Sequence, residues 1–116
     1  MRAALALVAL AGCSWFGVNG PGTLPDPPPA ADEVHCTSSD VLPTIDALAG
    51  AGLLAAAAGG VIAEETGSHG IAEHWELYYA LPMMAVSVAY FVASAHGTHA
   101  VEQCLVAKDP SLPPVQ

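Results

Sequence analysis

The chain has 116 residues, of which 53% are apolar and only 11% are charged. An average soluble domain carries roughly 25% charged residues, so this chain has little polar surface with which to face water. It has 2 basic and 11 acidic residues, which argues against nucleic acid as a partner, because phosphate contacts need Lys and Arg. The same imbalance argues against recruitment to anionic lipid headgroups, and the length allows one small domain at most.

The first twelve residues have the pattern of an export signal. Arg2 precedes an apolar run that closes with small residues just before Cys13. The run is about ten residues long, too short to span a bilayer as a helix. Residues 1–12 are therefore predicted to be a signal peptide.

The four residues Leu10-Ala11-Gly12-Cys13 resemble the lipobox of bacterial lipoprotein precursors. The resemblance implies that the signal is cut before Cys13 and that Cys13 carries a covalent lipid, on the exported side of the cell envelope. Alternatives are cleavage elsewhere by the ordinary peptidase and an uncleaved anchor. In many such lipoproteins an aspartate after the cysteine is associated with inner-membrane retention. Because Ser14 takes that place here, the resemblance favours the outer membrane by a small margin.

Two further cysteines, Cys36 and Cys104, remain once Cys13 is assigned to the lipid. An even pair in an exported protein predicts a disulfide. The alternative is two independent buried thiols. Residues 13–39 before the first helix are rich in proline and are predicted to form a lipid-anchored linker, either extended as a spacer or folded back along the surface.

Two apolar stretches predict helices at about 41–65 and 73–106, within a helical domain over 40–107 and ahead of a flexible tail over 108–116. Ser39 or Asp40 supplies an N-cap for the first helix, and Pro43 fits its first turn. Asp46 is expected near the membrane boundary, where it compensates the helix dipole. The uncharged part that follows, 47–63, is about 17 residues long, the lower limit for a transmembrane helix.

The second stretch is the better candidate for crossing a membrane, because about 19 residues from Leu77 to Ala95 are uncharged. Trp75, Tyr78 and Tyr79 lie at one end, where amphipathic rings favour the membrane–water boundary. Pro82 is expected to kink the helix.

The predicted fold is an all-α antiparallel two-helix hairpin that crosses a membrane. Its open end would collect Cys36, Cys104 and lipidated Cys13 on the exported side. Four glutamates and no Lys or Arg lie at its closed end, where the positive-inside rule would favour basic residues in a cytoplasmic loop. A rival interpretation is a soluble helical pair tethered only by lipid, although 77–95 is apolar on all faces.

Small residues recur every four positions on both helices, and such stripes let helix backbones approach closely in lipid. Either the two stripes face each other or one faces another protomer, and Ala-rich composition alone also produces such spacing. The stripes comprise Gly52, Ala56 and Gly60 on the first helix, and Ala85, Ala89, Ala93 and Gly97 on the second.

Two looser resemblances concern the helices themselves. The glycines at 50, 52, 59 and 60 are similar to those of small glycine-zipper envelope lipoproteins. Cys36-Thr37-Ser38, followed by Pro43 and Asp46, resembles small two-helix lipoproteins. Neither resemblance implies a catalytic residue.

The best candidate for chemistry is His96, His99 and Glu102, whose spacing of three places them near one face of a helix and suits a divalent metal. The alternative is ordinary polar residues at a membrane boundary. His69 and His74 do not share a helix face, and the sequence around Ser68 lacks the glycine and the strand of a nucleophile elbow. No enzyme activity is therefore expected.

These features predict a small lipid-anchored envelope protein with a structural or accessory role. Its partners would be the lipid bilayer and either a second copy or a larger envelope complex. The alternative function is a metal-binding module at the exported membrane surface, and otherwise no cofactor is expected.

Overall fold

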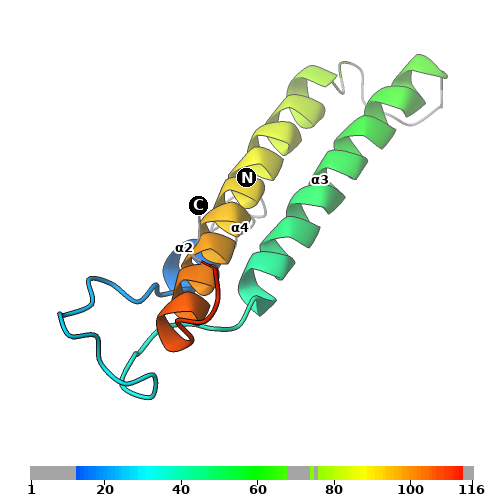
Figure 1. The fold of residues 1–116 in the computed structure, drawn as a ribbon. Helices are drawn as coiled ribbons and strands as arrows, with labels where there is room; N and C mark the ends of the chain where they lie inside the picture. The colour runs from blue at the N-terminus through cyan, green and yellow to red at the C-terminus, as the bar shows by residue number, and fades with distance from the viewer. Residues whose placement is uncertain (1–12, 68–73, 75, 114–116) are drawn as a thin grey trace.

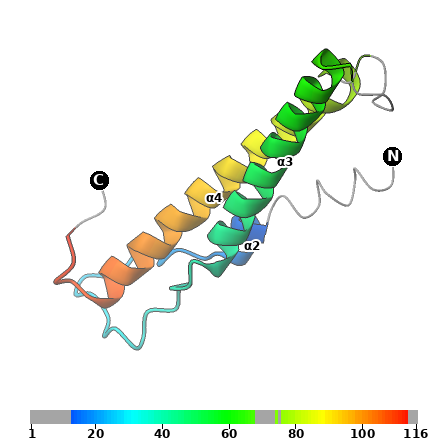
Figure 2. The same ribbon diagram turned by 90° about the vertical axis from the view of Figure 1, so that its right-hand side faces the viewer.

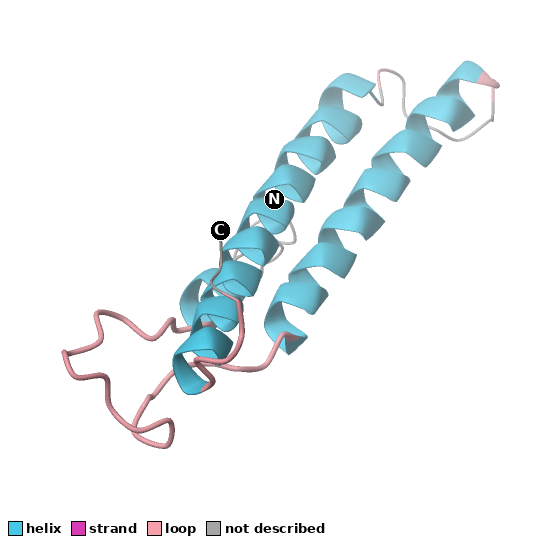
Figure 3. Cartoon of the chain, in the orientation of Figure 1, coloured by secondary structure: helices cyan, strands magenta, loops and turns pink. Residues whose placement is uncertain are grey.

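A computed structural model describes residues 13–67, 74 and 76–113 of the chain. This part is built from helices and loops and contains no strand (Figure 3). The helical elements are α2 (Cys13–Gly17), α3 (Val41–Glu65), the short π-helix η1 (Glu76–Ala80) and α4 (Leu81–Lys108). The predicted all-α class is confirmed for the described residues, whereas the signal peptide predicted over 1–12 lies outside them.

Helix α3 begins and ends where the sequence predicts. At its start Asp40 takes the N-cap position but its side chain makes no capping bond, and the backbone N–H of Val41 donates to Ser39 Oγ at 3.4 Å. At its end the hydroxyl of Thr66 donates to the carbonyl of Ile62 at 3.0 Å. Gly67 follows with a φ of +72°, a conformation that glycine adopts at little cost and that turns the chain away from the helix axis.

The second long helix starts with a change of helix type that the sequence did not predict. Five residues of η1 precede α4, and Pro82 lies in the first two positions of α4. Proline has no N–H to donate, so it is tolerated at a helix start, and here the switch from π to α winding coincides with the missing donor. The helix ends at Lys108, two residues beyond the predicted end. Hydrogen bonds from Ser111 then hold the pKa of Asp109 below its ordinary value.

Helices α3 and α4 lie side by side (Figures 1 and 2). Ser87 Oγ donates to the carbonyl of Gly50 at 2.8 Å, and Ser94 Oγ donates to the carbonyl of Pro43 at 2.8 Å. Since the later residue of α4 pairs with the earlier residue of α3, the two helices run in opposite directions. A Cβ added at Gly50 would lie 3.2 Å from the carbonyl oxygen of Ser87, so glycine sets the close approach of the backbones.

The faces in contact only partly match the predicted small-residue stripes. The buried residues of α3 are Pro43, Asp46, Gly50 and Ala57, and those of α4 are Ser87, Tyr90, Ala93, Gly97, Ala100, Val101 and Cys104. Of the predicted packing residues, Ala93 and Gly97 are thus buried, and Gly97 lies against Pro43 of α3 and Ser14 of α2.

The other stripe positions do not lie in that contact. Gly52, Ala56, Ala85 and Ala89 are exposed, and a Cβ at Gly52 would meet no atom within 4 Å, while Gly60 is half-buried. A strict spacing of four drifts about 40° around a helix at each step, whereas the observed face mixes spacings of three and four. The α3–α4 contact therefore does not follow the two stripes along their length, and the alternative that a stripe faces another protomer stays a prediction.

Large apolar side chains of both helices point outward rather than into a core. Within the most apolar window of each helix, only 17% of α3 and 22% of the η1–α4 segment is buried, and both helices are long and apolar enough to cross a membrane. The exposed apolar side chains include Ile45, Leu48, Leu54 and Ile62 of α3 and Met84, Val88, Phe91 and Val92 of α4.

The segment predicted as a linker is more ordered than expected. Its first residues form α2, which packs against both α3 and α4 near the start of α3 (Figure 2). Val18 of this segment is buried with Ala100 and Val101 of α4 in a small apolar cluster. The long excursion that follows is closed at its base, because Thr37 N–H donates to the carbonyl of Asn19 at 2.9 Å and Asn19 N–H donates to Thr37 Oγ1 at 3.1 Å.

Of the two possibilities left open for residues 13–39, the segment folded back on the helices agrees with the packing of α2 and Val18. The sequence left both possibilities open because proline excludes helix and central strand without specifying where the chain goes.

Candidate functional site

The polar and cysteine-bearing residues gather at one end of the helices, which we call the cysteine end: α2, the segment 34–46, and residues 94–108 of α4. Cys36 and Cys104 lie at disulfide distance there, with their Cα atoms 5.8 Å apart, as predicted from cysteine parity. Cys104 is fully buried, and Cys36 is half-buried. The bridge ties the segment before α3 to the last turns of α4.

The second feature of the cysteine end is the buried carboxylate of Asp46. Its side chain is 1% exposed, and Oδ2 accepts the backbone N–H of Ser14 at 2.9 Å. The other oxygen, Oδ1, is buried without a hydrogen-bond partner, as is the hydroxyl of Ser14. Asp46 therefore holds the first turn of α2 against α3, over a sequence separation of 32 residues.

The expectation for Asp46 is corrected by this geometry. Asp46 was expected within the first turn of its helix, compensating the helix dipole, but it is the sixth residue of α3 and lies beyond the first turn. Its place near the membrane boundary stays a prediction. The sequence did contain a signal, since a carboxylate within an apolar helix needs a partner. The partner is a backbone N–H from a distant segment, and a backbone donor leaves no trace in the sequence.

Gly97 makes room for α2 at this site. A Cβ added to Gly97 would lie 2.8 Å from Ser14 Cβ and 2.8 Å from Pro43 Cγ, closer than packed carbon atoms approach. Next to this contact, the ring of Trp15 stacks on that of His96, with centroids 4.5 Å apart. Phe16 points outward and is 86% exposed. The residues that follow Cys13 thus present one stacked ring and one free apolar ring.

The predicted metal-binding residues lie in different surroundings. His96 stacks on Trp15, whereas the ring of His99 is hydrogen-bonded to Gln103 at 2.9 Å. Glu102 is exposed. Among the described residues no three His, Cys, Asp or Glu side chains are close enough to hold a metal ion. Metal binding by these residues therefore remains a prediction from spacing.

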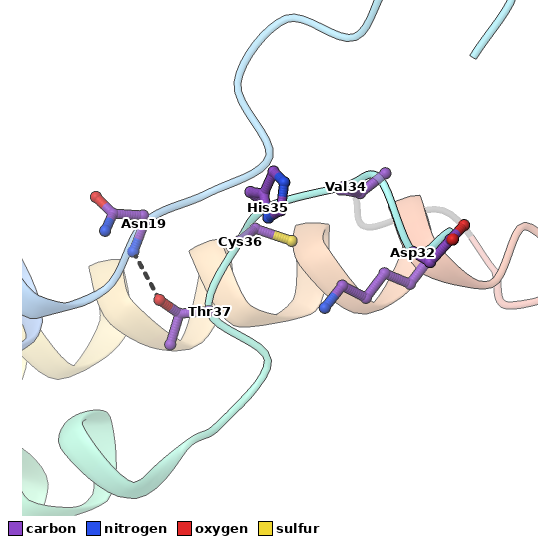
Figure 4. A pocket seen from close by; sticks show the side chains of 7 residues that line it. Asn19, Asp32, Val34, His35, Cys36 and Thr37 are labelled. Atoms are coloured by element: carbon purple, nitrogen blue, oxygen red, sulfur yellow. Dashed lines mark hydrogen bonds between the residues drawn. The ribbon is translucent and has the colours of Figure 1, made fainter. Parts of the chain in front are cut away.

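A pocket of about 440 Å³ opens beside the disulfide (Figure 4). Its lining combines one carboxylate, one ammonium and one imidazole, from Asp32, Lys108 and His35. Asn19, Val34, Cys36 and Thr37 complete the wall. The base of the excursion 19–37 thus forms a polar surface at the cysteine end.

The opposite end of the helices is described only in part. Tyr78 and Tyr79 are 66% and 45% exposed there, which suits the predicted aromatic boundary. Trp75, Ser68 and His69 lie outside the described residues. His74, which is described, has a φ of +61° and its carbonyl accepts the N–H groups of Leu77 and Tyr78.

Comparison with known proteins finds no matching family model, no matching curated protein and no matching solved structure.

Proposed function

We propose that the chain is a small lipid-anchored membrane protein of the bacterial cell envelope, with a structural or accessory role. In this proposal α3 and α4 cross the bilayer as a hairpin, and the cysteine end lies on the exported side. A diacylglyceryl group from a phospholipid is attached to Cys13: a sulfur–carbon bond forms, the glycerol carbon–phosphate oxygen bond breaks, and the headgroup phosphate leaves with the thiol proton.

The observation that carries the proposal is the outward exposure of the large apolar side chains of α3 and α4. A soluble helix pair would bury them in a core, because each large apolar side chain gains about 1.5–3 kcal/mol on leaving water. Here most of each apolar window remains uncovered, and lipid would cover it. This observation favours the hairpin in a membrane over the rival soluble pair.

The position of α2 supports the lipid anchor. Ser14 contacts Asp46, which lies just before the uncharged run of α3. A lipid on Cys13 would thus enter the bilayer at the level where α3 enters it. The exposed rings of Trp15 and Phe16 suit that boundary, where amphipathic and aromatic side chains gather.

Alkaline carbonate extraction tests the membrane domain separately from the lipid. The signal is replaced by an ordinary cleavable one and Cys13 is changed to Ser, so that no lipid is attached. The protein is expected to stay in the membrane pellet, because the helices themselves hold it there. Release into the supernatant would contradict the hairpin and leave the lipid as the only anchor. The unmodified lipoprotein serves as the control.

The exposed small residues support assembly with a second copy or a larger envelope complex. Gly52 and Ala56 lie on a face of α3 that α4 does not cover, and a helix that carries small residues there can be approached closely by another helix. Ala85 and Ala89 are exposed in the same way on α4.

Substitution at Gly52 tests this assembly. Gly52→Leu is expected to reduce intermolecular crosslinking in membranes by about fivefold, because the side chain holds the partner backbone away at a cost of about 1 kcal/mol. The fold should be kept, since nothing lies within 4 Å of the added Cβ. Leu54→Ala, which changes an exposed apolar residue about 200° around the same helix from Gly52, is the control. Unchanged crosslinking in Gly52→Leu would remove this face from the assembly.

A further inference from the structure

Asp46 is a buried carboxylate for which the described part of the chain supplies no cation. The carboxylate is 1% exposed, and the single hydrogen bond it receives comes from the neutral amide of Ser14. Burying an ionised carboxylate without a cation is costly. Arg2 would leave with the signal, so Lys108 would be the one Lys or Arg side chain of the mature chain, and it lines the pocket beside the disulfide.

Signal cleavage would create the missing cation beside Asp46. Hydrolysis of the Gly12–Cys13 peptide bond consumes one water, leaves a carboxylate on Gly12 and leaves a protonated amine on Cys13. The nitrogens of Cys13 and Ser14 are separated by only three covalent bonds, which allow at most about 3.7 Å between them. Because Ser14 N already lies 2.9 Å from Oδ2, the new amine is within reach of the unpartnered Oδ1.

We propose that Asp46 is the receptor for the mature N-terminus: its Oδ1 binds the α-ammonium group of Cys13, while Oδ2 keeps the N–H of Ser14. This inference rests on the proposed cleavage at Cys13. It adds two consequences. The lipidated residue is held against α3 by Asp46. The α-amine is also not acylated, because an N-acyl amide would carry no charge to pair with the carboxylate.

The protein is purified from membranes in detergent, and the mass of its N-terminal peptide is measured. This mass tests the proposed anchor and the new inference separately. A peptide that begins at Cys13 with one diacylglyceryl group and no further acyl chain is expected. A chain that is uncut, or cut elsewhere, would refute the lipid anchor of the proposed function. Cleavage and lipidation at Cys13 with an additional N-acyl chain would keep the anchor and overturn the inference.

Labelling of amines then tests the role of Asp46. The mature chain has two amines, the N-terminus and Lys108, and an acetylating reagent at pH 7 modifies only their deprotonated forms. In a free peptide the α-amine, with a pKa of about 7.7–8.0, reacts much faster than lysine. Pairing with Asp46 is expected to slow acetylation of the α-amine by about tenfold compared with a free peptide. Acetylation of Lys108 in the same molecule provides the internal reference.

Variants test whether the carboxylate of Asp46 is what slows acetylation of the α-amine. Asp46→Asn is expected to restore rapid labelling of the α-amine, whereas Asp46→Glu keeps the carboxylate and should retain most of the protection. Asp40→Asn is the matched control, because Asp40 is exposed and makes no capping bond. Equal α-amine labelling in the wild-type chain and Asp46→Asn would overturn the inference. If Asp46→Asn fails to fold, the wild-type chain alone decides. Acetylation of its α-amine more slowly than in a free peptide supports the inference, and acetylation at the free-peptide rate overturns it.

Discussion

Replacing both Cys36 and Cys104 with serine is expected to lower the free energy of unfolding by about 4 kcal/mol. The bridge closes a loop of 68 residues, and a crosslink of that span removes a large part of the entropy of the unfolded chain. It also ties the segment before α3 to α4, so its loss should loosen the base of the excursion 19–37. Thermal unfolding of the double variant in mild detergent measures the effect.

Reduction of the wild-type protein provides the matching measurement. The reduced chain should unfold at nearly the same temperature as the double variant, because both lack the same crosslink. A loss below about 1 kcal/mol in both would mean that the helix contacts alone hold the cysteine end together. A loss only in the double variant would assign the effect to the serine at the buried position of Cys104.

Gly97→Leu is expected to lower the free energy of unfolding by about 3 kcal/mol. Even the first carbon of the new side chain would collide with Ser14 and with the ring of Pro43, each 2.8 Å away. Proline cannot move aside within the first turn of α3, so α2 must shift away from α4. The hydrogen bond from Ser14 to Asp46 and the ring contact between Trp15 and His96 are both lost in that shift.

Gly52→Leu is the matched control for Gly97→Leu, since it adds the same side chain to a helix position with open space around it. Its unfolding temperature should stay close to that of the wild type, measured in dilute detergent where the chains are separate. The fluorescence of Trp15, with Trp75 replaced by Phe, should change in Gly97→Leu and not in Gly52→Leu. Equal stability of the two variants would contradict the close packing of α2 on Gly97.

The helices were predictable because their signals are local. The capping candidates Ser39 and Asp40, Pro43 in the first turn and an uncharged run are all local signals, and they locate the start of α3 near residue 41. The second helix was predictable as a long apolar segment, but its π-helical beginning was not. Pro82 excludes one hydrogen bond, and the way in which the backbone absorbs that loss depends on the turns before it.

The candidate site was only half predictable. Cysteine parity indicated the Cys36–Cys104 pair without knowledge of the fold. The environment of Asp46 was missed, because its partner is a backbone N–H that any residue at position 14 except proline would supply. The spacing of His96 and His99 suggested a shared ligand, yet one ring stacks on Trp15, which comes from a segment that the sequence describes only as a linker.

By itself, then, the sequence determined that the chain is helical, where its two apolar helices lie and which cysteines pair. These properties follow from hydropathy, capping and parity, which act over a few residues or by counting. Only the tertiary structure decided which helix faces meet, that α2 folds back onto them and that Asp46 is buried beneath Ser14. Those outcomes depend on contacts between segments more than thirty residues apart. A shift of one residue along a helix rotates its side chains by about 100° and so changes which of them are buried.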